Sequence, residues 1–196
     1  MPNLRSICVF CGSSPAVDDL YVASARDVGG LLASRGLRIV YGGGRLGLMG
    51  ALADAAVAAG GEVVGVIPGA LVEKEVAHRG LSELRVVGSM HERKALMADL
   101  SDAFIALPGG IGTLEEFFEI WTWGQLGLHH KPFGLLNVGG FYDPLLAFLD
   151  QLADRRFLRP EHRDMVHMRS VTSDLLHAME SYRPIDVWQW LSSAES

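Results

Sequence analysis

The chain has 196 residues, of which 49% are hydrophobic and 20% charged, with 23 glycines and 8 prolines. This composition predicts one packed globular domain over residues 1–196 and excludes disordered, collagen-like and disulfide-stapled chains. The 17 basic and 23 acidic side chains give a formal net charge of -6. Such a balance offers no general attraction to the phosphates of nucleic acid or to an anionic membrane surface.

The sequence shows no targeting segment and no disulfide framework. No apolar run reaches the ~18 residues of a membrane span, and residues 1–14 lack the basic start and apolar stretch of a signal peptide. We therefore expect a cytoplasmic protein. Cys8 and Cys11 have C-x-x-C spacing, but no second ligand pair for zinc exists, and positions three apart in a strand point to opposite faces. We interpret both as free thiols, buried or half-buried.

Short apolar runs bounded by Gly, Pro or Ser alternate with longer helical patterns along the chain. These patterns predict strands near residues 5–11, 37–42, 62–67, 84–87, 102–107, 132–138 and 166–171. They predict helices near residues 18–35, 46–60, 90–100, 113–126, 142–155 and 172–182. Several strands are apolar at every position, as expected when helices cover both faces of a sheet. The predicted fold is α/β, a doubly wound, mainly parallel, Rossmann-like sheet that binds ligands beyond the carboxyl ends of its strands.

The loops after the first two predicted strands are rich in serine and glycine. Ser13 and Ser14 can donate hydroxyl groups to a ligand, or they can form a turn before the helix. Gly42, Gly44 and Gly47 form a G-x-G-x-x-G pattern, but no acidic residue ends the next strand to hold a ribose hydroxyl. The pattern therefore disfavours NAD. It leaves two interpretations, a close approach of the backbone to a ligand or a structural turn.

A third glycine-rich loop runs from Leu107 to Glu116, after the fifth predicted strand. Free N–H groups at the start of a helix, beside glycines that lack a Cβ, make a cradle for a phosphate. The absence of a Walker lysine disfavours triphosphate hydrolysis. Thr113 and Glu116 also have the spacing of a capping box. Glu116 is thus either a functional carboxylate or a helix cap.

A basic segment, residues 90–97, completes the set of candidate sites. Arg93 and Lys94 lie near the start of a predicted helix, where the helix dipole favours acidic side chains. An anion bound nearby would explain the two cations. The alternative is an ordinary surface pair with Glu92 or Asp99. None of the seven His residues has the spacing of a metal site.

Residues 41–50, residues 90–94 and the P-G-G-x-G-T-x-x-E pattern of residues 108–116 together resemble the LOG (Lonely Guy) family of cytokinin riboside 5'-monophosphate phosphoribohydrolases. Members are also described as lysine decarboxylase-like. The resemblance covers the chain from Cys8 to about Tyr182. It implies hydrolysis of the N-glycosidic bond of an adenine-type nucleoside 5'-monophosphate, with or without an N6 modification. It also implies a homodimer that uses no metal or organic cofactor.

The resemblance implies that Arg93 and Glu116 are the catalytic residues. A carboxylate beside the ribose can stabilise the oxocarbenium-like cation and orient the attacking water. Arg93 either holds the phosphate or polarises the substrate. The full set of expected substrate-binding residues is Ser14, Gly43, Gly44, Glu75, Arg93, Lys94, Gly109, Gly110, Ile111, Gly112, Thr113, Leu114, Glu115, Glu116 and Thr122.

Two alternative functions remain open at the level of sequence. A non-catalytic nucleotide carrier or sensor of the same fold would bind without turnover. A pyridoxal phosphate decarboxylase would need a Schiff base on Lys74, Lys94 or Lys131, of which only Lys94 lies beside the candidate loops. The sequence does not decide between AMP and N6-prenylated AMP as substrate, nor between hormone production and nucleotide salvage as role.

Overall fold

The computed structural model describes residues 4–72, 74 and 77–185, and its centre is one sheet of seven strands. Every pair of neighbouring strands is parallel, in the order β4-β3-β2-β1-β5-β6-β7. The strands are β1 (Ser6–Phe10), β2 (Arg38–Tyr41), β3 (Val63–Pro68), β4 (Glu83–Val87), β5 (Ala103–Ala106), β6 (Phe133–Leu136) and β7 (Val166–Arg169). The seven predicted strands and the parallel sheet are confirmed.

Helices follow the strands, and the six predicted helices are confirmed with small shifts at their ends. The helices are α1 (Asp19–Ser34), α2 (Gly47–Ala58), α3 (Gly69–Val72), α4 (Met90–Asp99), α5 (Ile111–Gln125), α6 (Asp143–Asp154), α7 (Pro160–Asp164) and α8 (Thr172–Glu180), with the 3-10 turn η1 (Val138–Gly140). The sequence did not predict α3, α7 and η1, because elements this short are too brief to show a helical period. The predicted strand ending at residue 138 stops at Leu136, before Gly139 and Gly140 turn the chain with positive φ.

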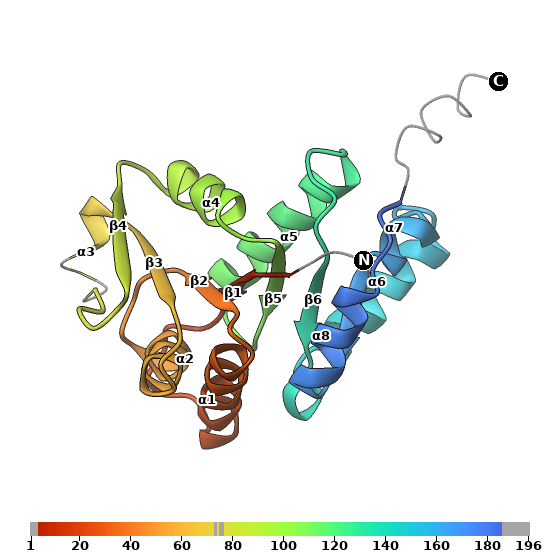
Figure 1. The fold of residues 1–196 in the computed structure, drawn as a ribbon. Coiled ribbons are helices and arrows are strands. Elements are labelled where there is room, and N and C mark those ends of the chain that lie inside the picture. Colours follow the sequence, from red (N-terminus) through yellow and green to blue (C-terminus); the bar gives the residue numbers. More distant parts are fainter. Residues whose placement is uncertain (1–3, 73, 75–76, 186–196) are drawn as a thin grey trace.

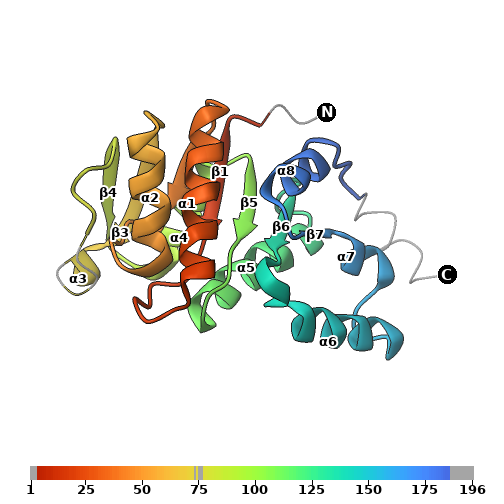
Figure 2. The ribbon, with the colours of Figure 1, turned by 90° about the horizontal axis from the view of Figure 1, so that it is seen from below.

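Helices cover both faces of the sheet, as the apolar strands predict (Figure 1). The two faces have separate hydrophobic cores. One core joins α1, α2 and α8 to the sheet, and α1 and α2 lie side by side against it (Figure 2). The other core joins α4, α5 and α6 to the opposite face. The strands β1 and β5 lie at the centre and are buried along their whole length.

The order of the strands reverses between β1 and β5. From β1 the chain builds β2, β3 and β4 outward to one side, and it then returns to add β5, β6 and β7 on the other. Loops that leave two such central strands run in opposite directions, which opens a crevice at their carboxyl ends. The loops after β1 and β5 are the serine and glycine loops singled out in the sequence, so the topology brings two of the three candidate loops together.

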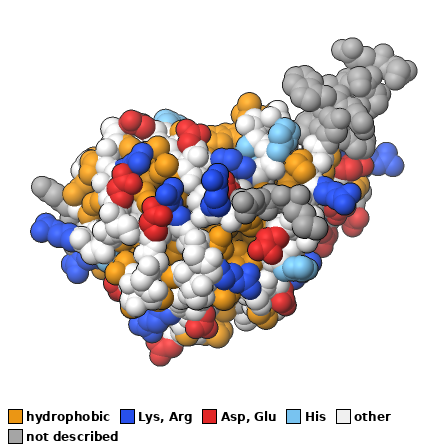
Figure 3. All heavy atoms as spheres, in the orientation of Figure 1, with side chains coloured by type: hydrophobic (Ala, Val, Ile, Leu, Met, Phe, Trp, Pro, Cys, Tyr) orange, Lys and Arg blue, Asp and Glu red, His pale blue; other side chains and the backbone are white. Residues whose placement is uncertain are grey.

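The outer surface mixes charges of both signs. On the face drawn in Figure 3, acidic and basic side chains lie interspersed with apolar ones. Within residues 4–72, 74 and 77–185, no helix is long and apolar enough to cross a membrane. The single domain expected over residues 1–196 extends past the described part of the chain and stays a prediction.

Candidate active site

The site lies at the crevice where the strand order reverses. The loop after β1 and the loop after β5 touch there, since the Gly12 N–H donates to the Pro108 carbonyl at 3.2 Å. A Cβ added at Gly12 would lie 3.3 Å from the Gly109 Cα, so a side chain there would begin to crowd the backbone. Two glycine-bearing loops can therefore pass each other at backbone distance and close one wall of the crevice.

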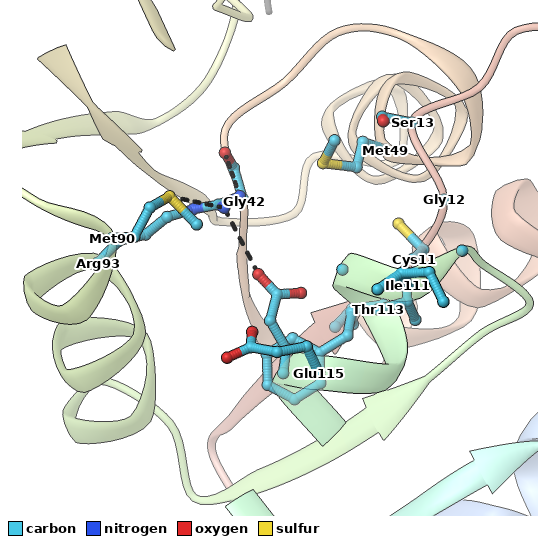
Figure 4. A pocket seen from close by; sticks show the side chains of 15 residues that line it. Cys11, Gly12, Ser13, Gly42, Met49, Met90, Arg93, Ile111, Thr113 and Glu115 are labelled. Carbon is cyan, nitrogen blue, oxygen red and sulfur yellow. Dashed lines mark hydrogen bonds and ion pairs between the residues drawn. The ribbon is translucent and has the colours of Figure 1, made fainter. Parts of the chain in front are cut away.

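A pocket of about 360 Å³ opens at this crevice (Figure 4). This volume lies at the lower end of the range for small-molecule sites. Its lining comes from five segments, the ends of β1 and β2 and the starts of α2, α4 and α5. The lining residues are Val9, Phe10, Cys11, Gly12, Ser13, Gly42, Met49, Met90, Arg93, Gly110, Ile111, Gly112, Thr113, Glu115 and Glu116.

The helix α5 starts inside this pocket, at Ile111, with Gly110 in extended conformation as its N-cap. The Thr113 side chain is buried and packs directly against the Cα of Gly109, so that any side chain at position 109 would clash with it. The first N–H groups of a helix have no acceptor within the helix. Those of α5 face the pocket and carry the positive end of the helix dipole, which suits an anion.

The capping-box interpretation of Thr113 and Glu116 is wrong. It requires Thr113 to precede the helix, whereas α5 begins two residues earlier and Thr113 is its third residue. Glu116 therefore lies beyond the first turn. Its carboxylate forms an ion pair with Arg93, from the Arg93 Nη1 to the Glu116 Oε1 at 3.5 Å, with 7% and 12% of the two side chains exposed.

The guanidinium of Arg93 is anchored by two backbone carbonyls. Its Nε donates to the Val66 carbonyl at 3.0 Å and its Nη2 donates to the Gly42 carbonyl at 3.1 Å. The approach to Gly42 is close enough that a Cβ at that position would collide with the guanidinium. Arg93 thus links the carboxyl ends of β2 and β3 to Glu116 on α5. Three different segments hold one planar group in place.

Lys94 points to two other carboxylates of α5, Glu115 in the pocket lining and Glu119 one turn further along the helix. Its ammonium contacts Glu115 and lies 3.0 Å from Glu119, and only 9% of the side chain is exposed. Burial alone would lower the pKa of Lys94, but hydrogen bonds to the two glutamates raise that pKa above its ordinary value. The lysine is therefore a firmly protonated cation that ties α4 to α5.

The surface-pair interpretation of Arg93 and Lys94 is also wrong, since both are buried and pair with α5 rather than with Glu92 or Asp99. Glu92 instead serves the start of its own helix. The Ser89 hydroxyl accepts from the Glu92 N–H at 3.1 Å, and the Glu92 carboxylate accepts from the Gly88 N–H at 2.7 Å. This cap offsets the cost of two cations near the start of α4.

Both cysteines are free and buried, as predicted, and they belong to opposite cores of the sheet. Cys11 lines the pocket. Burial, followed by the negative charge of Glu116, raises the pKa of the Cys11 thiol well above its ordinary value. A protonated thiol is a poor nucleophile. The reactive groups of this pocket are therefore its carboxylates and its cation, and Cys11 contributes an apolar wall.

The structure brings some of the expected binding residues together and leaves others outside the pocket. Of the fifteen, the pocket lining includes Arg93, Gly110, Ile111, Gly112, Thr113, Glu115 and Glu116. Gly109 and Ser14 line a neighbouring cavity instead. Leu114 packs against the core beneath α5, and Thr122 is exposed further along that helix, where its hydroxyl donates to the Phe118 carbonyl. Glu75 lies outside the described residues.

The G-x-G-x-x-G loop has a mainly structural role within one copy of the chain. Gly43, with φ of 76°, packs against β3 and β4, and Gly44 forms a bridge with Ala77. Gly47 lies against the backbone of the Ser13–Ser14 turn, where no side chain would fit. Only Gly42 reaches the pocket. The structural-turn interpretation thus describes most of this loop.

Two methionines in the pocket wall were not predicted as site residues. Met49 comes from the first turn of α2 and Met90 from the first residue of α4, and the Met90 sulfur lies 3.9 Å from an Arg93 nitrogen (Figure 4). Each belongs to a motif that the sequence had singled out. Their apolar side chains gave no chemical signal of their own.

No cluster of His, Cys, Asp and Glu with the size of a metal site occurs in the part of the chain that the structure describes. None of the described lysines belongs to the pocket lining, and Lys131 donates to the Ala98 carbonyl at 2.8 Å. The arrangement as a whole combines an anion cradle, a carboxylate one turn further along the same helix and an arginine that holds this carboxylate.

Comparison with known proteins finds a matching family, similar individual proteins and similar solved structures. A family described as possible lysine decarboxylase matches residues 49–179. A probable cytokinin riboside 5'-monophosphate phosphoribohydrolase of Oryza sativa subsp. japonica is 52% identical over 182 residues, which span 93% of this chain and 74% of the relative. A cytokinin riboside 5'-monophosphate phosphoribohydrolase of Rhodococcoides fascians is 53% identical over 166 residues, or 84% of either chain.

Among solved structures, the molybdenum cofactor carrier protein of Chlamydomonas reinhardtii superposes with a TM-score of 0.68 at 22% identity, covering 90% of this chain and 96% of that one. At this identity the likeness establishes the fold alone.

Proposed function

The chain belongs to the family of cytokinin riboside 5'-monophosphate phosphoribohydrolases, and we propose that its reaction takes place between Glu116 and the start of α5. It hydrolyses the N-glycosidic bond of N6-modified adenosine 5'-monophosphates and releases the free base and ribose 5-phosphate. The two relatives that are 52% and 53% identical over most of the chain support this activity.

One observation carries the assignment to this pocket. The Glu116 carboxylate lies three residues after Thr113 on α5, or about 4.5 Å along the helix axis. A phosphate held at the first turn of the helix therefore places the attached ribose beside this carboxylate. The spacing between anion cradle and carboxylate suits a nucleoside monophosphate, with the anomeric carbon near Glu116.

Charge then suggests the role of each group. Breaking the ribosyl bond builds positive charge on the sugar and negative charge on the departing base. The Glu116 carboxylate stabilises the sugar cation and orients or deprotonates the attacking water. The N–H groups of Ile111, Gly112 and Thr113 hold the phosphate. The water oxygen bonds to the anomeric carbon as the bond from that carbon to the base nitrogen breaks, and the proton lost by the water ends on the departing base.

Arg93 acts through Glu116 in this account. Its Nε and Nη2 are committed to the Val66 and Gly42 carbonyls, and Nη1 faces Glu116. We therefore treat Arg93 as a positioning residue that fixes the carboxylate, rather than as the ligand of the phosphate. Lys94 supports the same helix through Glu115 and Glu119.

The decarboxylase alternative fits these residues poorly. A lysine that forms a Schiff base needs a lowered pKa and an open path to its nitrogen. The Lys94 ammonium is buried between two glutamates that raise its pKa. An absorbance scan after addition of pyridoxal phosphate tests this, and we expect no aldimine band.

The activity is tested by incubating the chain with AMP and with N6-isopentenyladenosine 5'-monophosphate and measuring both products. Equal amounts of base and ribose 5-phosphate are expected, and the comparison gives the preference between the two nucleotides. Tight nucleotide binding without release of either product would support the carrier or sensor instead.

We further propose that the enzyme is a homodimer built on the outer face of α5. Ile111 at the start of this helix is 82% exposed, and Leu126 and Leu128 just beyond its end are 65% and 69% exposed. Thr122 lies about 14 Å further along α5 than Thr113, too far to contact a substrate held at the start of its own helix. A second copy packed on this face would supply Thr122 to the site.

Light scattering of the wild-type chain and of Leu126→Asp tests the dimer. We expect a dimer for the wild type and a less active monomer for the variant, with Val171→Asp, an exposed apolar position outside α5, unchanged. A fully active wild-type monomer would contradict the proposal. A cytoplasmic location is also proposed, supported by two cysteines that remain free thiols.

A further inference from the structure

A second pocket of about 310 Å³ opens beside the first. Gly12, Ser13 and Gly110 line both pockets, so the loop after β1 and the start of α5 form the wall between them. Beyond this wall the second pocket is bounded by the start of α1, by α2 and by the turn after β6. The proposed reaction gives this cavity no role.

The lining of the second pocket is apolar and uncharged. Val17, Tyr21, Leu48, Pro108 and Phe141 supply its side-chain surface, and none of the residues that line it is charged. The rings of Tyr21 and Phe141 meet edge to face, with centroids 5.6 Å apart. Polar groups come from Ser13, Ser14, the Tyr21 hydroxyl and the backbone of the glycine loops. Such a cavity suits a neutral, ring-shaped ligand with a few hydrogen-bonding atoms.

The aromatic wall is held in place before any ligand arrives. Tyr142 follows Phe141, and its hydroxyl donates to the Leu107 carbonyl at 2.6 Å while its N–H donates to Asn137 Oδ1 at 2.7 Å. These bonds fix the turn after β6 to the loop after β5. Phe141 itself lines the cavity and is 39% exposed. An apolar ring held open to solvent loses little entropy when a ligand covers it.

The two pockets differ in the charge that they can hold. The first combines the anion cradle of α5 with Arg93, Glu115 and Glu116, whereas none of the residues that line the second is charged. The two products of the proposed reaction differ in the same way. Ribose 5-phosphate is an anion, and an adenine with an apolar N6 substituent is a neutral ring.

We propose that the second pocket binds the free N6-substituted purine base, while the sugar phosphate occupies the first. The inference rests on the proposed function for the identity of the base, but it concerns binding alone and requires no turnover. The ring lies against Tyr21 and Phe141, and its nitrogens meet the hydroxyls of Ser13 and Ser14. The base then leaves the pocket past the exposed ring of Phe141.

Isothermal titration of the protein with free N6-isopentenyladenine tests the proposal. The wild type is expected to bind the base, and Phe141→Asp to bind it at least tenfold more weakly, because it places a charge in an uncharged cavity. Phe141→Leu keeps an apolar wall and should lose less than threefold. Phe148→Asp changes another exposed phenylalanine, outside both pockets, and should bind like the wild type.

A competition experiment separates the two pockets. Glu116→Gln is saturated with AMP, which should fill the first pocket, and is then titrated with N6-isopentenyladenine. An unchanged dissociation constant supports a second site. Displacement of the base by AMP, absence of base binding, or full binding by a folded Phe141→Asp each overturns the proposal. Because these are equilibrium measurements, a wild type that binds the base but releases no ribose 5-phosphate would refute the proposed activity and leave the base site standing.

Discussion

Replacing Arg93 by lysine tests whether Arg93 positions the Glu116 carboxylate or binds the substrate. The arginine makes three contacts, with the Val66 carbonyl, the Gly42 carbonyl and the Glu116 carboxylate. Lysine keeps the charge but has one nitrogen on a flexible stem, so it can retain one of these contacts at good geometry. Two contacts from a charged donor are lost.

The cost follows from those two contacts. Hydrogen bonds of charged donors contribute about 1.5–3 kcal/mol each, so the upper estimate for the loss is about 3–6 kcal/mol. A lysine that relaxes toward one carbonyl recovers part of this, and we expect the free energy of unfolding to fall by about 3 kcal/mol. Domains of this kind have roughly 5–15 kcal/mol of stability, so the variant remains folded at low temperature.

The effect on catalysis should appear in kcat. A carboxylate that moves by about 1 Å can lower the rate about 100-fold. Since the phosphate is held by backbone N–H groups of α5, KM should change less than threefold. Urea unfolding and steady-state kinetics of Arg93→Lys measure both quantities. Arg85→Lys alters an exposed pair with Glu83 and should change stability by less than about 0.5 kcal/mol. A tenfold rise in KM with unchanged stability would show that Arg93 binds the substrate.

Two further predictions concern stability. Arg156 has φ of 64° where α6 ends, and the bonds from Arg156 N–H to Ala153 and from Phe157 N–H to Leu152 form the turn that glycine favours. Arg156→Gly should therefore raise the free energy of unfolding, measured by urea titration, by about 1 kcal/mol. The control Arg155→Gly should lower it. A destabilised Arg156→Gly would show that the positive φ of Arg156 causes no strain. Burial lowers the pKa of His167 below its ordinary 6.5, so the unfolded chain binds the proton more readily and stability is lost as pH falls below about 7. Thermal melts between pH 7.5 and 5.5 should show a smaller loss of stability for His167→Phe than for the wild type, and an equal loss would contradict this role of His167. Hydrogen bonds from Arg5 and Ser6 outweigh burial and lower the pKa of Asp102, so this carboxylate affects stability only in stronger acid.

The fold could be predicted from the sequence because each strand is a short apolar run between turn residues. Ala103–Ala106 is apolar at every position and lies at the centre of the sheet, buried between helices on both faces. The turns that the sequence missed have no such pattern. Pro160–Asp164 is a single polar turn, and the chain at Gly139 and Gly140 folds back where a continued strand was expected.

The site was predicted only as far as its motifs reach. The glycine loop before α5 was indicated by its residue types, and the proposed roles of Arg93 and Glu116 came from the family resemblance. The start of α5 could not be placed to the residue, because Gly110 can cap a helix without any side-chain signal, and this error produced the capping-box alternative. The bonds from Arg93 to Val66 and Gly42 depend on which strands are neighbours, which no local pattern reports.

The proposed hydrolysis depends most directly on the Glu116 carboxylate. The measurement is the rate of ribose 5-phosphate release from N6-isopentenyladenosine 5'-monophosphate by the wild type, by Glu116→Gln and by Glu115→Gln. We predict a loss of at least about 1000-fold for Glu116→Gln with nucleotide binding retained, and a much smaller loss for Glu115→Gln, whose carboxylate pairs with Lys94. Glu116→Gln with more than a tenth of the wild-type rate would contradict the account.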